Sequence, residues 1–269
     1  MKTKIIIGMI ILSMILITAC SSEKGPLTDE NIKNEIIKAN SDLKSYDFQG
    51  KMNIIMILDS PDESFEVESE MTMEGEIDRD KKQARIKMDM KTKIEDFPME
   101  LTFYTYMIDE YMYIGIMGQW SKMRYGEDEW IEQDQMEQML QLIYSGDVTL
   151  EGTETLNGQE YYVANIKPDL EKLTEMILQS QELIPFTEVM NIQDLIRDYE
   201  ETVWINKNTH IIERTKSKAT MVMSAENFGE EGEGELKMIY DSEFTLSNID
   251  KKVDITLPSE AINAVEVFI

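Results

Sequence analysis

Apolar residues recur at every second position through much of residues 65–123, and this alternation constrains the fold more than any other feature of the chain. Met88 and Met90, for example, flank Asp89. Successive side chains of a β-strand point to opposite faces of a sheet, so a period of two separates an apolar face from a polar one. The pattern therefore predicts an antiparallel meander with one methionine-rich face and one charged face.

Turn signals divide this pattern into strands. Breaks are expected at residues 77–82, at Phe97-Pro98 and near Asp109-Glu110. Further along, Asn157-Gly158 separates two apolar-rich runs and is a strong hairpin signal. Other strands are expected over residues 46–58, 111–115, 119–123, 148–156, 159–166, 202–205, 210–224 and 236–246, with an extended tail at 254–258.

Helical periodicity appears in the segments between the strands. Ile32, Ile36, Ala39 and Leu43 form one stripe, which predicts a helix over residues 28–44 capped by Thr28. Further helices are expected from Asp128 to Gly146, after Pro168, and in a shorter segment with Val189, Ile192 and Ile196 inward. No linker divides the chain, so we expect an α+β fold: one curved antiparallel sheet with several helices on one face.

The amino terminus has the features of a secretion signal. Lys2 and Lys4 precede an apolar run, residues 5–17, that is too short to span a bilayer. Small residues directly before Cys20 resemble the lipobox of bacterial lipoproteins. This resemblance implies cleavage of a signal peptide, residues 1–19, and a diacylglycerol thioether on Cys20, with residues 20–27 as the lipidated tether. The alternative is a signal peptide with an incidental cysteine; no second cysteine exists for an intramolecular disulfide.

The charge balance narrows the choice of partners. The chain has 26 basic and 53 acidic residues, a net charge of −27. Nucleic-acid binding and docking of the protein surface on anionic lipid both need cationic patches, so neither is expected.

Methionine is unusually frequent, with 21 in the chain. Flexible, polarisable thioethers suit an adaptable wall for apolar guests. The candidate lining of a hydrophobic ligand site is Met71, Met73, Met88, Met90, Met99, Leu101 and Phe103. The same residues are equally suited to packing beneath helices. Pairs such as Met221-Val222-Met223 also allow Cu(I) binding, although strand alternation alone generates such pairs.

Signals of catalysis are weak. His210 is the only histidine and is expected at the surface, where a strand begins. One histidine excludes two-histidine metal motifs, and no Gly-x-Ser-x-Gly segment accompanies it. No acidic residue lies in an apolar run that would raise its pKa. We therefore expect neither an enzyme nor a metal or other cofactor.

Several short motifs, taken in order, resemble the lipoprotein-localisation carriers, the LolA-like half-barrel superfamily. They are the lipobox at Cys20, the Tyr111-Met112-Tyr113 and Trp120 hairpin, the Gly152-Thr153-Glu154…Asn157-Gly158 hairpin, the Val203-Trp204-Ile205-Asn206 turn and Leu257-Pro258. The superfamily includes mycobacterial lipid-carrying lipoproteins and a periplasmic sensor of lipoprotein stress. The chain is also similar to uncharacterised methionine-rich lipoproteins of Gram-positive bacteria.

The resemblance implies an open half-barrel over residues 28–269, with helices covering its concave face and a hydrophobic or lipid guest inside. The sequence thus predicts a lipid-anchored lipoprotein on the extracytoplasmic face of a bacterial, Gram-positive cell membrane. Its concave Met-rich face would bind a lipid or another hydrophobic molecule. The alternative is an envelope sensor or interaction module that grips a partner protein with the same fold.

Overall fold

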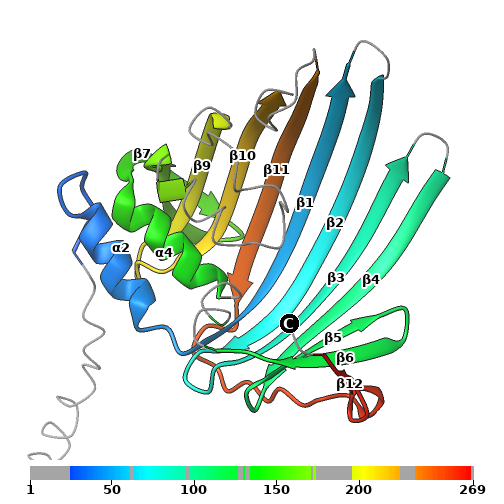
Figure 1. Ribbon diagram of the computed structural model, residues 1–269. Coiled ribbons are helices and arrows are strands. Elements are labelled where there is room, and N and C mark those ends of the chain that lie inside the picture. The colour runs from blue at the N-terminus through cyan, green and yellow to red at the C-terminus, as the bar shows by residue number, and fades with distance from the viewer. Residues whose placement is uncertain are drawn as a thin grey trace, which may run out of the picture.

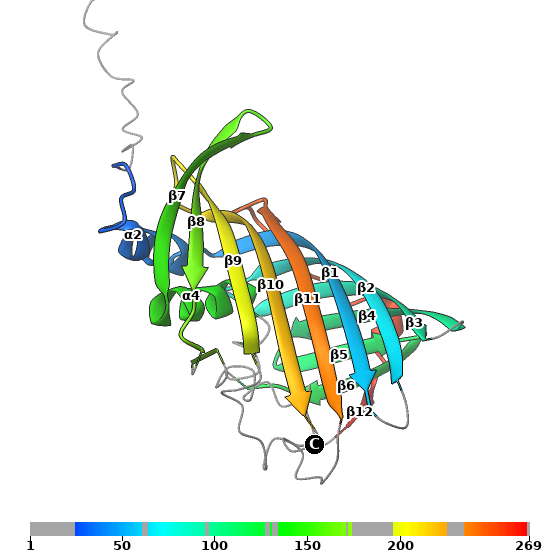
Figure 2. The same ribbon diagram turned by 90° about the horizontal axis from the view of Figure 1, so that it is seen from above.

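The computed structural model describes residues 25–60, 64–94, 97–126, 130, 134–170, 172–173, 196–224 and 234–267. Within them the chain forms one twelve-stranded open sheet, in the order β12-β6-β5-β4-β3-β2-β1-β11-β10-β9-β8-β7. Figures 1 and 2 show a strongly curved sheet, and we call the space on its concave, inward side the hollow. The strands are β1 (Ser45–Asp59), β2 (Ser64–Asp78), β3 (Gln83–Ile94), β4 (Phe97–Ile108), β5 (Tyr111–Ile116), β6 (Gln119–Arg124), β7 (Asp147–Leu156), β8 (Gln159–Lys167), β9 (Ile196–Asn206), β10 (Ile212–Ser224), β11 (Glu235–Ser247) and β12 (Val265–Glu266).

The sheet consists of two meanders joined at their first and last strands. Strands β1 to β6 pair antiparallel in chain order, and so do β7 to β11. Pairing of β1 with β11 along their lengths unites the two meanders, and β12 adds to β6 in parallel. The predicted antiparallel meander is confirmed. The break expected at Phe97-Pro98 comes slightly earlier in the chain, because these two residues are the first of β4 and pair with Ile94 and Lys93 of β3.

Two α-helices, α2 (Ile32–Ser41) and α4 (Gln135–Ser145), lie over the inward face at the end where β1 begins (Figure 1). Their apolar stripes match the predicted ones, since Ile32, Ile36 and Ile143 pack against β8 and β9. Met136 and Leu140 pack against the inward side chains of β1 to β5. In the described part of the chain, the fold prediction is therefore corrected from several helices to two α-helices, which cover one end of the hollow.

The helix boundaries differ from the predicted ones for local reasons. Helix α2 begins later than expected, with Asn31 rather than Thr28 at its N-cap. Helix α4 is capped by Asp134, whose carboxylate accepts hydrogen bonds from the backbone N–H groups of Met136 and Glu137. It ends at Gly146 as predicted. Asp128, the cap expected from the sequence, lies outside the described residues.

The segment after Pro168 is described only at its start, where Leu170, Lys172 and Leu173 are helical. The short helix expected around Val189 and Ile192 falls outside the described residues. Ile196, which was expected on the inward side of that helix, is instead the first residue of β9 and pairs with Met221 of β10. Strand β9 is thus longer than the four residues predicted.

The outward face is strongly charged, as the alternation predicts. Four glutamates of β2 lie directly opposite four basic residues of β3: Glu68 with Lys93, Glu70 with Lys91, Glu74 with Lys87 and Glu76 with Arg85. Cross-strand pairs of opposite charge favour this register over its neighbours. A shift by one residue would move the charged set into the hollow, so the pattern specifies which face is inward.

The carboxyl-terminal segment covers an aromatic cluster on the outward face. Val253 and Ile255 are buried against Tyr106, with Tyr113 and Trp120 alongside. The segment has no regular secondary structure over residues 251–258 and then forms a 3-10 turn, Ser259–Ala261. Neither α2 nor α4 is long and apolar enough to cross a bilayer, and the described residues include no other candidate span.

Candidate functional site: the inward apolar face

All seven side chains predicted to line a ligand site lie on the same face of the sheet. Directly opposed residues of neighbouring strands share a face, and the registers of β2, β3 and β4 link the seven together. By the same registers, Phe48, Ile77 and Met107 also lie on this face, and they pack against α4. The face that carries Met71, Met73, Met88, Met90, Met99, Leu101 and Phe103 is therefore the inward one.

Three rows of opposed residues cross the hollow and contain these seven. The first is Leu101, Met90, Met71, Met52, Ser242, Ser217, Glu201 and Ile166. The second is Phe103, Met88, Met73, Gly50, Phe244, Thr215 and Val203. The third is Met99, Thr92, Ser69, Ile54, Tyr240, Ala219 and Tyr199. We call the first of them the methionine row.

The predicted lining is not packed like a core. Met99 is 41% exposed, and the other six candidates are partly buried. The fully buried inward residues, such as Tyr46 and Met107, lie instead beneath α4 at the covered end. The inward face thus has a filled end and a methionine-lined part where the side chains retain accessible surface.

A polar cluster interrupts the apolar face at one end of the methionine row. Glu201 of β9 is 1% exposed, and its Oε2 accepts a hydrogen bond from the hydroxyl of Tyr199. Ser217 of β10 lies opposite Glu201, and Ser242 of β11 lies opposite Ser217. In the three rows, Glu201 is the one charged side chain among the described residues.

Burial is the largest cause of the pKa shifts in this cluster. Desolvation raises the pKa of Glu201 to about 7, against the lowering effect of hydrogen bonds from Tyr199 and Ser217. Burial, reinforced by the Glu201 carboxylate, also raises the pKa of the Tyr199 hydroxyl far above its ordinary value. No acid with a raised pKa was expected from the sequence, so that expectation is wrong for Glu201.

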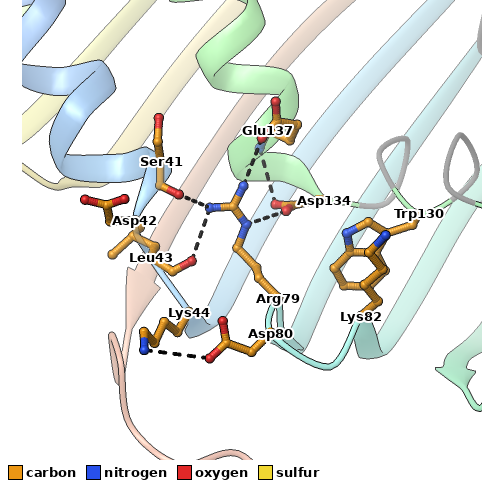
Figure 3. Close-up of a pocket in the computed structure, with 10 residues that line it drawn as sticks. All are labelled: Ser41, Asp42, Leu43, Lys44, Arg79, Asp80, Lys82, Trp130, Asp134 and Glu137. Atoms are coloured by element: carbon orange, nitrogen blue, oxygen red, sulfur yellow. Dashed lines mark hydrogen bonds and ion pairs between the residues drawn. The ribbon is translucent and has the colours of Figure 1, made fainter.

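A second candidate is a polar pocket of about 550 Å³ at the covered end, lined by Ser41, Asp42, Leu43, Lys44, Arg79, Asp80, Lys82, Trp130, Asp134 and Glu137 (Figure 3). Arg79 lies in the β2–β3 turn and reaches both helices. Its Nε is 2.6 Å from Asp134 Oδ2 and its Nη2 is 2.9 Å from Glu137 Oε2. Its Nη1 donates to carbonyl oxygens at the end of α2.

The arrangement in this pocket is structural. Asp134 also accepts a hydrogen bond of 3.0 Å from the Tyr46 hydroxyl, and burial raises the pKa of that phenol. The guanidinium of Arg79 is therefore hydrogen-bonded to the carboxyl end of α2 and to the amino end of α4. It fastens both helices over the sheet and offers little bonding capacity to a ligand.

His210 lies in the interior rather than at the surface, which corrects the prediction. It is 1% exposed, in the β9–β10 turn with a positive φ of 61°. Its Nδ1 is 3.4 Å from Glu35 Oε2 of α2, and its ring lies edge-on to Tyr162. The turn directs the residue beneath α2, which alternation within the strand did not indicate.

Metal binding receives no support from carboxylate or imidazole groups. The described residues contain no group of three His, Cys, Asp or Glu side chains that could hold a metal ion. The Met-x-Met pairs follow strand parity, with Met71 opposite Met90 and Met73 opposite Met88.

These features define a class of protein: an open, antiparallel β half-barrel with an apolar, methionine-rich inward face and a charged outward face. A family model described as a family of unknown function (DUF6612) matches residues 28–266. The chain belongs to this family. A search of curated proteins returns no match.

Solved structures with a similar course of the chain share little sequence with it. The lipoprotein LppX of Mycobacterium tuberculosis is 12% identical, with 85% of this chain and 100% of that chain covered and a TM-score of 0.43. LprF from Mycobacterium bovis is 14% identical, with 88% and 100% covered and a TM-score of 0.45. The MucA/MucB complex of Pseudomonas aeruginosa gives 12% identity, 89% and 64% coverage and a TM-score of 0.34.

Proposed function

We propose that this protein is a lipid-anchored lipoprotein on the extracytoplasmic face of the cell membrane, where it binds a lipid or other hydrophobic ligand. The observation that supports binding is the state of the inward face: seven apolar side chains, gathered by strand register, keep accessible surface beside a helix-filled end. Exposed apolar surface of this kind is costly in water and is stabilised when a ligand covers it.

The methionines favour a flexible guest over a rigid one. In the methionine row, Met52, Met71 and Met90 follow one another on three adjacent strands. Each thioether chain has three rotatable bonds, so the row can adapt to an irregular apolar body such as an acyl chain. Burying such a body gains about 25 cal/mol for each Å² of apolar surface removed from water.

The anchor depends on Cys20, which lies outside the described residues together with the rest of residues 1–24. We expect Cys20→Ser to abolish lipid attachment. Two or more acyl chains hold a protein stably on a bilayer, and a protein without acyl chains lacks this anchor. In cells fed a radiolabelled or alkyne fatty acid, the wild-type chain should incorporate label and sediment with membranes. The variant should do neither, and labelling of the variant would contradict the proposal.

Ligand binding is tested by placing charge on the inward face. We expect the double variant Met71→Lys with Met90→Lys to bind a fluorescent fatty-acid or alkyl probe at least about tenfold more weakly, because two apolar contacts are lost and two ammonium groups must be desolvated. Native mass spectrometry of the gently purified protein should show the same loss for any co-purifying lipid.

Thr72→Lys is the matched control. Thr72 lies between Met71 and Met73 but points outward and is exposed, so its variant should bind as the wild type does. If the inward double variant folds and binds as well as this control, the inward face is not the ligand site. A wild-type chain that binds no hydrophobic probe at all would favour the alternative of a protein-interaction or sensor module.

A further inference from the structure

One buried carboxylate on the inward face, that of Glu201, has an incomplete set of hydrogen bonds. Among the described residues, Oε1 of Glu201 has no hydrogen-bond partner, and neither has Oγ of Ser242, two strands away and 2% exposed. Both atoms belong to residues of the methionine row. Buried polar atoms without partners are uncommon in folded proteins, because they lose hydration and gain nothing in return.

The described chain supplies no cation to this carboxylate. The basic residues nearest in register on β10, Lys216 and Lys218, flank Ser217 and so point to the other face of the sheet, as does Arg214. Arg214 stacks over Trp204, 4.5 Å from the ring centroid, and lies 3.1 Å from Glu243. Lys218 lies opposite Glu200 and within 3.7 Å of Asp241. A buried carboxylate is retained at low cost only when a countercharge or full hydrogen bonding compensates it.

We infer that Glu201, together with Ser217 and Ser242, binds the amine end of an amphiphilic ligand whose apolar body lies along the methionine row. The inference rests on the proposed function and adds the chemical class of the ligand. The ligand class is an amphiphile with an ammonium group at one end of a long alkyl or acyl chain. It can be a membrane lipid or a free amphiphile.

The bonding requirements of an ammonium match the cluster. An ammonium donates three hydrogen bonds and carries one positive charge. Oε1 of Glu201 and Oγ of Ser242 are both free to accept, and Ser217 lies between them in register. A fatty alcohol would donate one hydrogen bond and leave the carboxylate without a countercharge. A fatty acid would place a second carboxylate beside the first, which is unfavourable at short range.

The position of the cluster joins it to the apolar surface. Glu201, Ser217, Ser242, Met52 and Met71 occupy five adjacent strands in one row. Neighbouring strands lie about 4.8 Å apart, so the polar end and the methionines form one continuous track across the sheet. An amphiphile laid along this track places its amine at Glu201 and its apolar body over the methionines.

The test compares three probes of equal length, hexadecylamine, hexadecanol and palmitic acid, by competition against a fluorescent alkyl probe at pH 8. The protein is the whole chain from residue 20 onward. The amine should bind roughly tenfold to a hundredfold more tightly than the alcohol, and the acid most weakly. Glu201→Gln should remove the advantage of the amine over the alcohol.

Glu200→Gln is the matched control, since Glu200 is exposed and points to the opposite face. It loses the same charge, so any general attraction of an acidic protein for amines falls equally in both variants. The control should keep the preference for the amine. If Glu201→Gln does not fold, Ser242→Ala replaces it and should weaken amine binding by about tenfold.

The outcomes separate this inference from the proposed function. Equal binding of all three probes would overturn the amine site and leave hydrophobic binding intact. So would an amine preference that is undiminished in Glu201→Gln or, where that variant does not fold, in Ser242→Ala. Failure of the wild type to bind any of the three would overturn the proposed function as well.

Discussion

Replacing Arg79 by methionine should destabilise the protein by about 3–5 kcal/mol, the loss typical of a buried ion pair left with one partner. The side chain of Asp134 is 2% exposed and would lose the guanidinium that lies 2.6 Å from its Oδ2. The carbonyl oxygens at the end of α2 would lose their donor as well. Chemical denaturation followed by circular dichroism gives the free energy of unfolding.

Arg85→Met is the control for this experiment. Arg85 pairs with Glu76 at 2.8 Å on the outward face, where its side chain is 48% exposed. Exposed pairs contribute about 0–1 kcal/mol, so this variant should lie close to the wild type. Adding Asp134→Asn to Arg79→Met should recover part of the lost stability, because the unpaired charge is removed. If the two arginine variants lose equal stability, the helices are not fastened by Arg79.

Glu201→Gln should change the dependence of stability on pH. In the folded protein the pKa of Glu201 is about 7, against 4.5 for an ordinary glutamate. The folded state therefore holds a proton that the unfolded chain releases between these two pH values. Its contribution to stability is fully present below pH 4.5 and is lost as pH rises through 7. The total loss is about 3 kcal/mol.

The glutamine variant has no such proton, so relative to wild type it should gain about 3 kcal/mol of stability between pH 4.5 and pH 8. Among the described residues, the titratable groups facing Glu201 are the Tyr199 and Tyr240 phenols, and burial raises the pKa of each. Both therefore stay protonated over this range. Urea denaturation at several pH values measures the difference. Glu200→Gln should give a curve parallel to that of the wild type, and a parallel curve for Glu201→Gln would refute the buried-acid account.

The sequence was sufficient to predict the meander and its inward face because a period of two maps directly onto strand geometry. Met88 and Met90 alternate with charged residues, so their shared face followed without knowledge of the turns. The open part of the hollow was harder to anticipate. Alternation indicates that a face is apolar, but not how far two short helices extend across it.

Residues whose role depends on distant contacts were missed. Arg79 lies in a polar run that signals only a turn, and nothing local indicates that its side chain reaches two helices. For Glu201 a signal existed: Tyr199, Glu201, Val203 and Ile205 alternate as inward residues do. The strand was expected to begin only at Thr202, so this acidic residue was left outside the pattern. His210 was misplaced because a left-handed turn, rather than strand parity, sets its direction.

The pairing of β1 with β11 has a consequence for how the molecule is made. The two strands come from opposite ends of the sequence, so the hollow cannot close along its middle until almost the entire polypeptide has emerged. Non-local pairing of this kind slows folding and leaves apolar strands exposed meanwhile. A chain of this design would need its methionine-bearing strands shielded until then. Charged residues at every alternate position help to keep those strands soluble until the last partner arrives.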